Sequence, residues 1–508
     1  MKTSLSPRVY PSRREYPSRS DDLSRRDFLR SLSLLGAASL LAACVPRATS
    51  LSSQESESLR YLKILSTNDE HGWLEQGSEY GGADSLMYQW VHEERILDDP
   101  DHHLLLSAGD LYTGPALSTW FKGESTVDIM NIMGYHAAAI GNHDFDYGLE
   151  NLQERAAQAK FPLISANIHL KATGAVPQFA HPFIIKEVNG LKIGLLGLTT
   201  RETPVDTKPA YVADLDFFHY ETAMKEIVPQ VRQAGADLVL ILGHLCTADL
   251  RSLAPLARQL EIPILFGGHC HEVTNETVEG VLLVQSGSFM RGYTRIDLLF
   301  DLQSKKLVSL RAGFHRNEPG RVDKTVTDRI KTWREQSDPA LWQGIGYARQ
   351  QIAHTSNEMA HLLAKAWLSA VQGAQVTLTS ARYVQSLPAG EITPADVVGM
   401  LATDDVLVKI ELSGSQLAGI IEDHHPLLGG LLEKDGFRFP DGKPLDLERI
   451  YSVLVPDDIY AGCQGYPLKQ LALSAQETGI GWREPVIDWI TAQKSSRSQP
   501  LESFLGDS

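Results

Sequence analysis

Aliphatic runs alternate with amphipathic stretches along the first half of the chain. The aliphatic runs are short, as is typical of parallel strands buried on both faces, and they lie at residues 62–65, 104–106, 137–140, 238–242 and 262–266. The amphipathic stretches carry apolar side chains at helical spacing, and they lie at residues 83–96, 125–133, 149–159 and 220–234. This alternation predicts an α/β fold, with helices layered on a sheet.

The pattern changes in the second half of the chain. Two β-like runs at residues 281–286 and 293–300 follow each other closely and predict an antiparallel portion of the sheet. Residues 322–336 have few apolar positions, so they predict a polar helix that connects two domains. The pattern that follows predicts a second domain, with a helix at 357–371 and strands at 376–379, 406–412 and 450–455. A chain of 508 residues is also too long for one hydrophobic core.

The N-terminus predicts export. Residues 24–30 contain a twin-arginine pattern, and an apolar stretch too short to span a bilayer follows at 32–43. This stretch ends in Leu-Ala-Ala before Cys44, like the lipobox of bacterial lipoproteins. We therefore expect a signal peptide at 1–43, a lipidated Cys44 and a Ser- and Glu-rich tether at 44–60. The alternative is a secreted protein without a lipid.

Export by this route predicts a periplasmic protein that is anchored to a bacterial membrane through Cys44. The next residue is Val45 rather than an aspartate, which favours the outer membrane over the inner one.

The net charge and the cysteine content limit which substrates and which disulfides can be expected. The net charge is −16, from 47 basic and 63 acidic residues, so a nucleic acid polymer would be repelled. A small phosphate ester remains open as a substrate, because metals can meet its charge locally. Cys246, Cys270 and Cys463 are too few for a disulfide framework. A bridge between Cys246 and Cys270 stays open, although we expect them to be buried free thiols.

Side chains that can bind metals recur where the predicted strands end, which is where ligands bind in open α/β sheets. They are Asp69, His71, Asp110, Asn142, His244, His269 and His271. At a strand tip, Asp69 and His71 would point to the same side and Glu70 away from them. Oxygen and imidazole ligands suit two divalent cations (Mn, Zn, Co or Fe), and Asp110 could bridge them. Two such cations can clamp a phosphoryl group and generate the attacking hydroxide.

His143 is expected to play a different part. It adjoins Asn142 but would be turned differently, and Asp146 could hydrogen-bond its ring and keep it oriented or protonated. A charged ring there would stabilise the transition state and the departing alkoxide. Each motif alone also has an ordinary explanation: residues 142–144 could cap a helix, and His244 could be a satisfied core histidine. Their shared position after successive strands favours one common site.

Five blocks together resemble the calcineurin-like metallophosphoesterase signature and, more closely, the bacterial 5′-nucleotidase family; they are residues 67–72, 108–110, 141–148, 243–244 and 268–271. The resemblance implies a four-layer αββα catalytic domain at 61–321, a connecting helix at 322–341 and a smaller α/β (α+β) substrate domain at 342–508. It implies one metal on Asp69, His71, Asp110 and His271, a second on Asp110, Asn142, His244 and His269, and His143 with Asp146 as the catalytic pair.

The second domain also resembles the family, in segments such as 387–393 and 461–466, but it departs where the family reads a nucleoside. The family's Pro-Phe-Gly-Asn run, whose aromatic ring stacks on the base, reads Ala-Thr-Asp-Asp at 402–405. The second stacking aromatic falls near Asp458, and Arg382 lies near the family's arginine position but out of register. Losing a stacked ring removes roughly 1–3 kcal/mol per base. The substrate-binding residues therefore stay unassigned.

The resemblance implies an extracytoplasmic dimetal hydrolase that cleaves phosphate esters, foremost nucleoside 5′-monophosphates or related nucleotides. One alternative keeps the metal site for another reaction, either that of a thiosulfohydrolase of sulfur oxidation or that of a nucleotide-sugar or cyclic-nucleotide phosphodiesterase. A second alternative is a surface lipoprotein that keeps the fold for binding without turnover. The complete set of metal-binding side chains argues against the latter.

Overall fold

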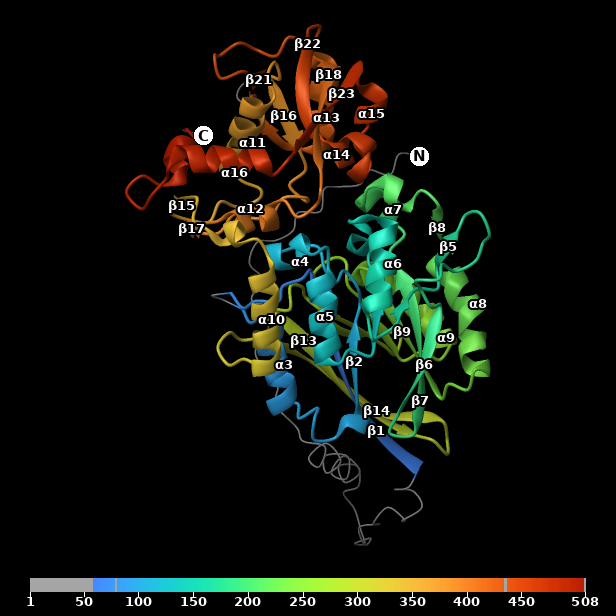
Figure 1. Cartoon of the computed structure of the whole chain (residues 1–508). Helices are drawn as coiled ribbons and strands as arrows, with labels where there is room; N and C mark the ends of the chain where they lie inside the picture. The colour runs from blue at the N-terminus through green and yellow to red at the C-terminus, as the bar shows by residue number, and fades with distance from the viewer. Residues whose placement is uncertain (1–57, 78–79, 434–435, 507–508) are drawn as a thin grey trace, which may run out of the picture.

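A computed structural model describes residues 58–77, 80–433 and 436–506 of the chain (Figure 1). The predicted export pattern, Cys44 and most of the tether lie outside the described residues. The described chain forms a larger N-terminal part and a smaller C-terminal part, drawn in orange and red at the top of Figure 1. None of the described helices is both long and apolar enough to cross a membrane.

The first sheet of the N-terminal part has the strand order β14-β13-β1-β2-β3-β4. Strands β1 to β4 run parallel to one another, whereas β13 is antiparallel to both β1 and β14. The strands are β1 (Leu59–Thr67), β2 (His103–Ser107), β3 (Ala137–Ala139), β4 (Leu163–Ile164), β13 (Gly292–Asp301) and β14 (Lys306–Arg316).

The second sheet has the order β11-β12-β10-β9-β7-β6, and its central strands β12, β10, β9 and β7 are parallel. Its strands are β6 (Phe183–Val188), β7 (Leu191–Thr199), β9 (Leu238–His244), β10 (Ile264–Phe266), β11 (Val273–Val278) and β12 (Val281–Ser286). The two sheets pack face to face, because Leu62 and Leu104 of the first share one buried cluster with Leu240 and Ile264 of the second.

Helices cover the outer face of each sheet. Those on the first sheet are α3 (Ala83–His92), α5 (Glu124–Met133), α6 (Gly148–Gln158) and α10 (Lys324–Gln336). Those on the second sheet are α8 (Tyr220–Gln233) and α9 (Thr247–Gln259). The predicted layering of helices on sheets is thus confirmed as a four-layer sandwich.

Two expectations differ from the structure. The runs at 281–286 and 293–300 do not pair with each other, because β12 belongs to the second sheet and β13 to the first. The polar helix at 322–336 is present as α10, but it is more than a connector. It buries Val326, Ile330 and Trp333 against the first sheet's helical layer, and the Trp333 indole donates a 2.8 Å hydrogen bond to Asp128. Three apolar residues one helical turn apart are enough to dock it.

The C-terminal part is built on a mixed sheet with the order β19-β16-β22-β18-β23. Its strands are β16 (Val376–Thr379), β18 (Val406–Ser413), β19 (Leu427–Gly429), β22 (Ile450–Pro456) and β23 (Ser474–Gly481). Its helices are α11 (Asn357–Ala370), α12 (Pro394–Met400), α13 (Gly414–His424), α14 (Asp457–Ala461), α15 (Leu468–Leu471) and α16 (Glu484–Gln493). Thr393 and Ser413 begin α12 and α13 with reciprocal capping boxes, which satisfy backbone N–H groups at each start.

The remaining elements are short. They are α4 (Ala116–Trp120), α7 (Thr203–Asp206), the strand pairs β5 (Ile168–Leu170) with β8 (Leu215–Phe217), β15 (Gly346–Ala348) with β17 (Gly390–Ile392) and β20 (Leu432–Glu433) with β21 (Phe437–Arg438), and the 3-10 turns η1 (Pro100–His102), η2 (His143–Phe145), η3 (Pro209–Val212), η4 (Pro339–Trp342), η5 (Cys463–Gly465) and η6 (Leu501–Phe504).

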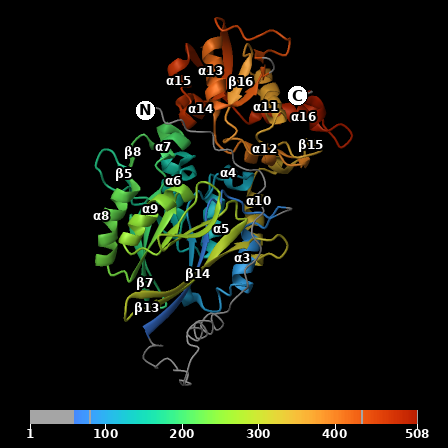
Figure 2. The same cartoon turned by 180° about the vertical axis from the view of Figure 1, so that it is seen from behind.

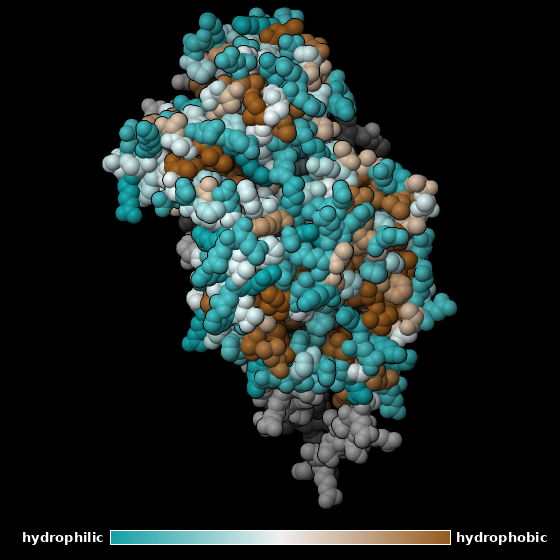
Figure 3. Space-filling model, viewed as in Figure 1, coloured by the Kyte–Doolittle hydropathy of each residue, from teal (hydrophilic) through white to brown (hydrophobic). Residues whose placement is uncertain are grey.

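The two parts meet at one end of the sandwich. Both Figure 1 and Figure 2, which shows the molecule from behind, place α12 above α4. Ala116 of α4 and Ala395 and Val398 of α12 form a small buried cluster with Leu341. The face in Figure 3 is mostly hydrophilic, with its hydrophobic residues in separate patches rather than in one continuous area.

Candidate active site

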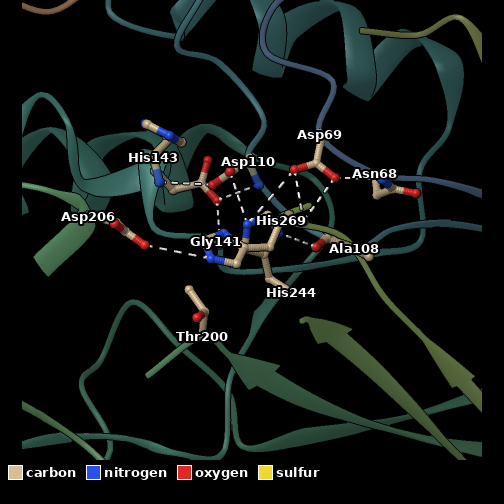
Figure 4. A network of polar contacts seen from close by, with 12 residues as sticks. Asn68, Asp69, Ala108, Asp110, Gly141, His143, Thr200, Asp206, His244 and His269 are labelled. Atoms are coloured by element: carbon tan, nitrogen blue, oxygen red, sulfur yellow. Dashed lines mark hydrogen bonds and ion pairs between the residues drawn. The ribbon is translucent and has the colours of Figure 1, made fainter. Parts of the chain in front are cut away.

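The metal-binding side chains predicted from the sequence meet at the end of the sandwich that faces the C-terminal part. They come from the last residue of β9 and from the segments that follow β1, β2, β3 and β10. Figure 4 shows side chains from four of these segments, including Asp69, Asp110, His244 and His269, pointing toward one another. Both sheets therefore contribute, since their parallel strands end at the same edge.

The loops that carry these residues have an unusual backbone. Five of the side chains stand on residues with left-handed φ angles: Asp69 (51°), His71 (46°), Asp110 (60°), His269 (72°) and His271 (55°). Such conformations cost roughly 1–3 kcal/mol each and persist only where the surroundings impose them. Here the two loops hold each other, because the Asp69 N–H donates to the Gly109 carbonyl at 2.8 Å and the His71 N–H to the Asp110 carbonyl at 3.0 Å.

The expectation that Asp69 and His71 stand at the tip of an extended strand is wrong. β1 ends at Thr67, so Asp69 and His71 converge through a left-handed turn rather than through the alternation of an extended strand. Glu70 is fully buried and accepts hydrogen bonds from the hydroxyls of Thr67 and Ser107. Its carboxylate therefore fastens β1 to β2 beneath the site.

Asp69, His71 and His271 form the first of two clusters. Their potential ligand atoms all lie within 4.8 Å of one another. The Nε2 atoms of His71 and His271 face each other at 3.3 Å. Nδ1 of His71 lies 2.8 Å from the Thr113 carbonyl, which fixes the ring and leaves Nε2 available to bind a metal ion. Burial lowers the pKa of His71 to about 4 and holds the pKa of His271 well below its usual value, so both rings are neutral, as metal ligation requires.

Asp110, His244 and His269 form the second cluster, again with ligand atoms within 4.8 Å of one another. Nε2 of His244 lies 3.0 Å from Asp110 Oδ2, and its Nδ1 lies 2.8 Å from the Ala108 carbonyl. Asn142 Oδ1 is buried without a hydrogen-bond partner among the described residues. Orphaned polar atoms of this kind are costly unless a ligand satisfies them. The residues therefore fit a second cation.

Asp110 stands between the two clusters. Its Oδ2 lies 3.8 Å from His71 Nε2 in the first cluster and 3.0 Å from His244 Nε2 in the second. The position is the one expected of a carboxylate that bridges two cations.

His143 and Asp146 lie beside the clusters as a pair. Nδ1 of His143 is 2.7 Å from Asp146 Oδ2, while the ring itself is 28% exposed. Burial opposes a charge on the ring, but the carboxylates of Asp146 and Asp110 outweigh it and raise the pKa of His143 to about 10. The ring is thus a cation near neutral pH, and it has a proton available to donate.

Three carboxylates near the site were missed by the sequence reasoning. Asp144 accepts the backbone N–H groups of Gly141 and Leu111, both at 2.8 Å, and so ties the β2 and β3 loops together. Glu202 and Asp206 approach His269 Nε2 at 3.5 and 3.7 Å. The sequence does hold a signal for Glu202 and Asp206. Both follow the aliphatic run at 191–199, which forms β7 and ends at the same sheet edge.

Cys246 and Cys270 form a disulfide, so the expectation of free thiols is wrong. Cys246 follows His244 closely and Cys270 lies between His269 and His271. The bond therefore fastens the β9 and β10 loops that present these histidines. Cys463 is buried and free.

The segment containing α7 links the site to the C-terminal part. The Thr207 hydroxyl donates to Asp146 Oδ1 at 3.1 Å. From the other side, the Cys463 thiol donates to the Thr207 carbonyl at 3.1 Å, and the Tyr383 hydroxyl donates to the Asp206 carbonyl at 3.3 Å. Beside them, Lys208 forms an ion pair with Asp457.

Comparison with known proteins agrees with this architecture. Residues 62–273 match the family model of the calcineurin-like phosphoesterases, and residues 338–437 match that of the 5′-nucleotidase C-terminal domain. The 5′-nucleotidase of Vibrio cholerae is 26% identical over 490 residues, which covers 83% of this chain and 88% of that protein. Protein UshA of Yersinia enterocolitica is 26% identical over 497 residues, which covers 84% of this chain and 90% of that protein.

The endonuclease YhcR of Bacillus subtilis is 24% identical over 450 residues, but the chain spans only 37% of that protein's length. Among solved structures, the 5′-nucleotidase precursor of Thermus thermophilus superposes with a TM-score of 0.76 at 22% identity, covering 86% of this chain and 97% of that one. The sulfate thiohydrolase SoxB of Thermus thermophilus superposes with a TM-score of 0.67 at 17% identity, covering 85% of this chain and 94% of that one. Both structures show the shared fold.

The sandwich, the paired Asp and His clusters and the two matched domains lead to one conclusion. The chain belongs to the 5′-nucleotidase family and is a dimetal phosphoesterase, with a metallophosphoesterase domain followed by a 5′-nucleotidase C-terminal domain.

Proposed function

We propose that the protein hydrolyses phosphate monoesters outside the cytoplasm, foremost nucleoside 5′-monophosphates or related nucleotides. The observation that carries this proposal is the position of Asp110 between the two histidine clusters, with the His143–Asp146 pair beside it. The name of the Vibrio cholerae relative, 5′-nucleotidase, supports a nucleotide substrate.

In this proposal Asp69, His71, Asp110 and His271 hold one cation, and Asp110, Asn142, His244 and His269 hold the other. When bound, the two cations polarise the phosphoryl group and activate water. The chain's own residues orient the ligand rings through the Thr113 and Ala108 carbonyls. The charged His143 stabilises the anionic phosphoryl group and gives its proton to the departing alkoxide, while Asp146 keeps the ring in place.

Export is the second part of the proposal. The twin-arginine pattern and Cys44 favour a lipid-anchored protein of the periplasm. The Cys246–Cys270 bond supports this, because disulfides persist in oxidising compartments. Growth with a radiolabelled fatty acid tests the anchor: we expect label on the wild-type chain and none on Cys44→Ser, and an unlabelled wild type would rule the anchor out.

A substrate panel tests the reaction. The purified mature chain, supplied with manganese, cobalt or zinc, is assayed on p-nitrophenyl phosphate, AMP, UDP-glucose, a cyclic nucleotide and a carrier-bound thiosulfonate. We expect release of phosphate from the monoesters. Preferential cleavage of the thiosulfonate would instead favour the SoxB-like alternative, and cleavage of the two diesters alone would make the protein a phosphodiesterase.

A further inference from the structure

The short helix α7 places two carboxylates beside the second metal-binding cluster. Nε2 of His269 lies 3.7 Å from Oδ2 of Asp206, the last residue of α7, and 3.5 Å from Oε2 of Glu202, which precedes the helix. In Figure 4 the Asp206 side chain points at the His269 ring, and a dashed line joins the two. Neither carboxylate has a part in the mechanism proposed above.

The two carboxylates differ in their exposure to solvent. The Asp206 side chain is 19% exposed, whereas the Glu202 side chain is 72% exposed. Water and salt screen an exposed charge, and a long exposed side chain loses conformational freedom when it is held in one place. The shorter and more buried Asp206 is therefore the better fixed partner for the imidazole.

The backbone that carries Asp206 is held on both sides. Before the helix, the Thr200 hydroxyl accepts the Glu202 N–H at 3.3 Å, and the Thr200 carbonyl accepts the Thr203 hydroxyl at 2.7 Å. At the end of the helix, the Asp206 carbonyl accepts the Tyr383 hydroxyl of the C-terminal domain at 3.3 Å. The carboxylate thus approaches the ring from a fixed support.

Two other histidines of the site show how a ligand ring is oriented here. A neutral imidazole that binds a metal through one nitrogen carries its proton on the other, and that N–H usually donates to a carbonyl or a carboxylate. His71 and His244 each turn Nδ1 to a backbone carbonyl at 2.8 Å. Among the described residues no backbone carbonyl is hydrogen-bonded to the His269 ring, whose Nε2 faces Glu202 and Asp206 instead.

We propose that Asp206 is a positioning residue for the second cation. Its carboxylate accepts the Nε2–H of His269 and so leaves Nδ1 of that ring to bind the cation. The inference rests on the proposed function, in which His269 is a ligand of this cation. We expect the contact between Asp206 and the ring to shorten when the cation is bound, as polar contacts in unliganded active sites often do.

A third cation between Glu202, Asp206 and His269 is the alternative, because their potential ligand atoms also lie within 4.8 Å of one another. That cation would need Nε2 of a ring whose Nδ1 binds the second cation. The imidazole would then have to lose the protons of both nitrogens. A proton kept on Nε2 and accepted by a carboxylate avoids this cost.

Manganese binding tests the inference without turnover. The metal-free mature chain is titrated with manganese near neutral pH, and the free ion is followed by electron paramagnetic resonance. We expect two tight sites in the wild type. In Asp206→Asn one of them should bind about 10- to 100-fold more weakly, as for other residues that orient a metal-bound histidine. His269→Ala identifies that site, because it removes the ligand itself.

Three further variants control the measurement. Asp206→Glu restores a carboxylate and should recover part of the lost affinity. Glu202→Gln removes the more exposed charge and should bind manganese almost as the wild type does. Asp214→Asn changes an exposed residue shortly after α7 and should bind as the wild type does. Equal melting temperatures of the metal-free wild type and Asp206→Asn would show that the fold is intact.

The manganese dependence of activity is a second readout. Asp206→Asn should need about 10- to 100-fold more manganese for half-maximal cleavage of p-nitrophenyl phosphate, while kcat at saturating manganese recovers toward the wild-type value. A loss of kcat that saturating manganese does not restore would overturn the positioning role, because a residue that only orients a ligand is compensated by excess metal.

The outcomes separate this inference from the proposed function. Wild-type affinity of Asp206→Asn at both sites would overturn the inference and leave phosphate ester hydrolysis intact. A third manganese ion in the wild type that Asp206→Asn loses would make Asp206 a ligand instead. Two bound ions without cleavage of any phosphate ester would overturn the proposed function alone. Fewer than two ions in the wild type would remove the second site and the inference with it.

Discussion

Nδ1 of His143 lies 2.7 Å from Oδ2 of Asp146, and the other oxygen of that carboxylate accepts the Thr207 hydroxyl at 3.1 Å. A single carboxylate therefore both orients the His143 imidazole and connects it to the segment that contacts the C-terminal domain.

The first prediction concerns His143 itself. Because the ring contributes a charge and a proton rather than a ligand atom, His143→Ala should lower kcat by about 100- to 10,000-fold. The bound metal, measured by inductively coupled plasma mass spectrometry, should remain at the wild-type level. Loss of metal in proportion to activity would instead make His143 a ligand.

Asp110 is expected to behave in the opposite way. Asp110→Asn removes the charge between the two clusters, so both metal content and activity on p-nitrophenyl phosphate should fall, the latter at least about 100-fold. Asp216→Asn, on an exposed residue of β8, serves as the control and should keep both. Full activity of Asp110→Asn would contradict the dimetal mechanism.

The Cys246–Cys270 disulfide should stabilise the catalytic domain. The two cysteines are 24 residues apart in sequence, a loop for which a disulfide contributes about 3 kcal/mol. We expect dithiothreitol to lower the melting temperature of the wild type and to weaken metal binding, since the bond fastens the loops of His244, His269 and His271. The double variant Cys246→Ala/Cys270→Ala should melt at the lower temperature and be insensitive to dithiothreitol; an unchanged wild type would show that the bond is not formed.

Lys208 should couple the two domains. Lys208→Met leaves the Asp457 carboxylate beside Asp405 and Asp458 without its partner, so we expect kcat/KM to fall by about tenfold. Adding Asp457→Leu should restore part of the loss, and this double-mutant cycle isolates the pair. The exposed pair of Lys324 and Asp328 is the control, and Lys324→Met should have no measurable effect. Additive single effects in the Lys208 cycle would exclude the coupling.

Asp458 should make stability depend on pH. Its pKa of about 7 in the folded protein exceeds the unfolded value of about 3.9, so the folded state binds the proton more tightly. The wild type should therefore lose stability as pH rises from about 4 to 7, by on the order of 1–4 kcal/mol. Asp458→Asn resembles the protonated form at every pH, so its melting temperature should match the wild type at pH 4 and exceed it at pH 8. Equal melting temperatures of the wild type and Asp458→Asn at pH 8 would mean that folding does not raise the pKa of the Asp458 carboxyl.

Much of the fold could be predicted because its signals are local. Aliphatic runs such as 104–106 and 238–242 become β2 and β9, and the amphipathic stretch at 220–234 becomes α8. A buried strand or a helix face produces a recognisable pattern in consecutive residues. The pairing of strands produces no such pattern, which is why β12 and β13 look like a pair in sequence but lie in different sheets.

The site shows the same division. The sequence by itself determined which side chains gather, because each follows a strand and parallel strands end at one edge. It also determined that His143 and Asp146 can pair, since they lie three residues apart.

Only the tertiary structure decided the rest. The left-handed turn at Asp69 and His71, the Cys246–Cys270 bond, the approach of Asp206 to His269 and the unpaired Asp458 each depend on loops brought together from distant parts of the chain. The charge and the hydrogen bonds that surround a side chain are set by what packs against it, and neighbours in sequence do not reveal them. The positions of the metal-binding side chains are thus encoded locally, whereas the contacts between the two domains arise only when distant segments pack together.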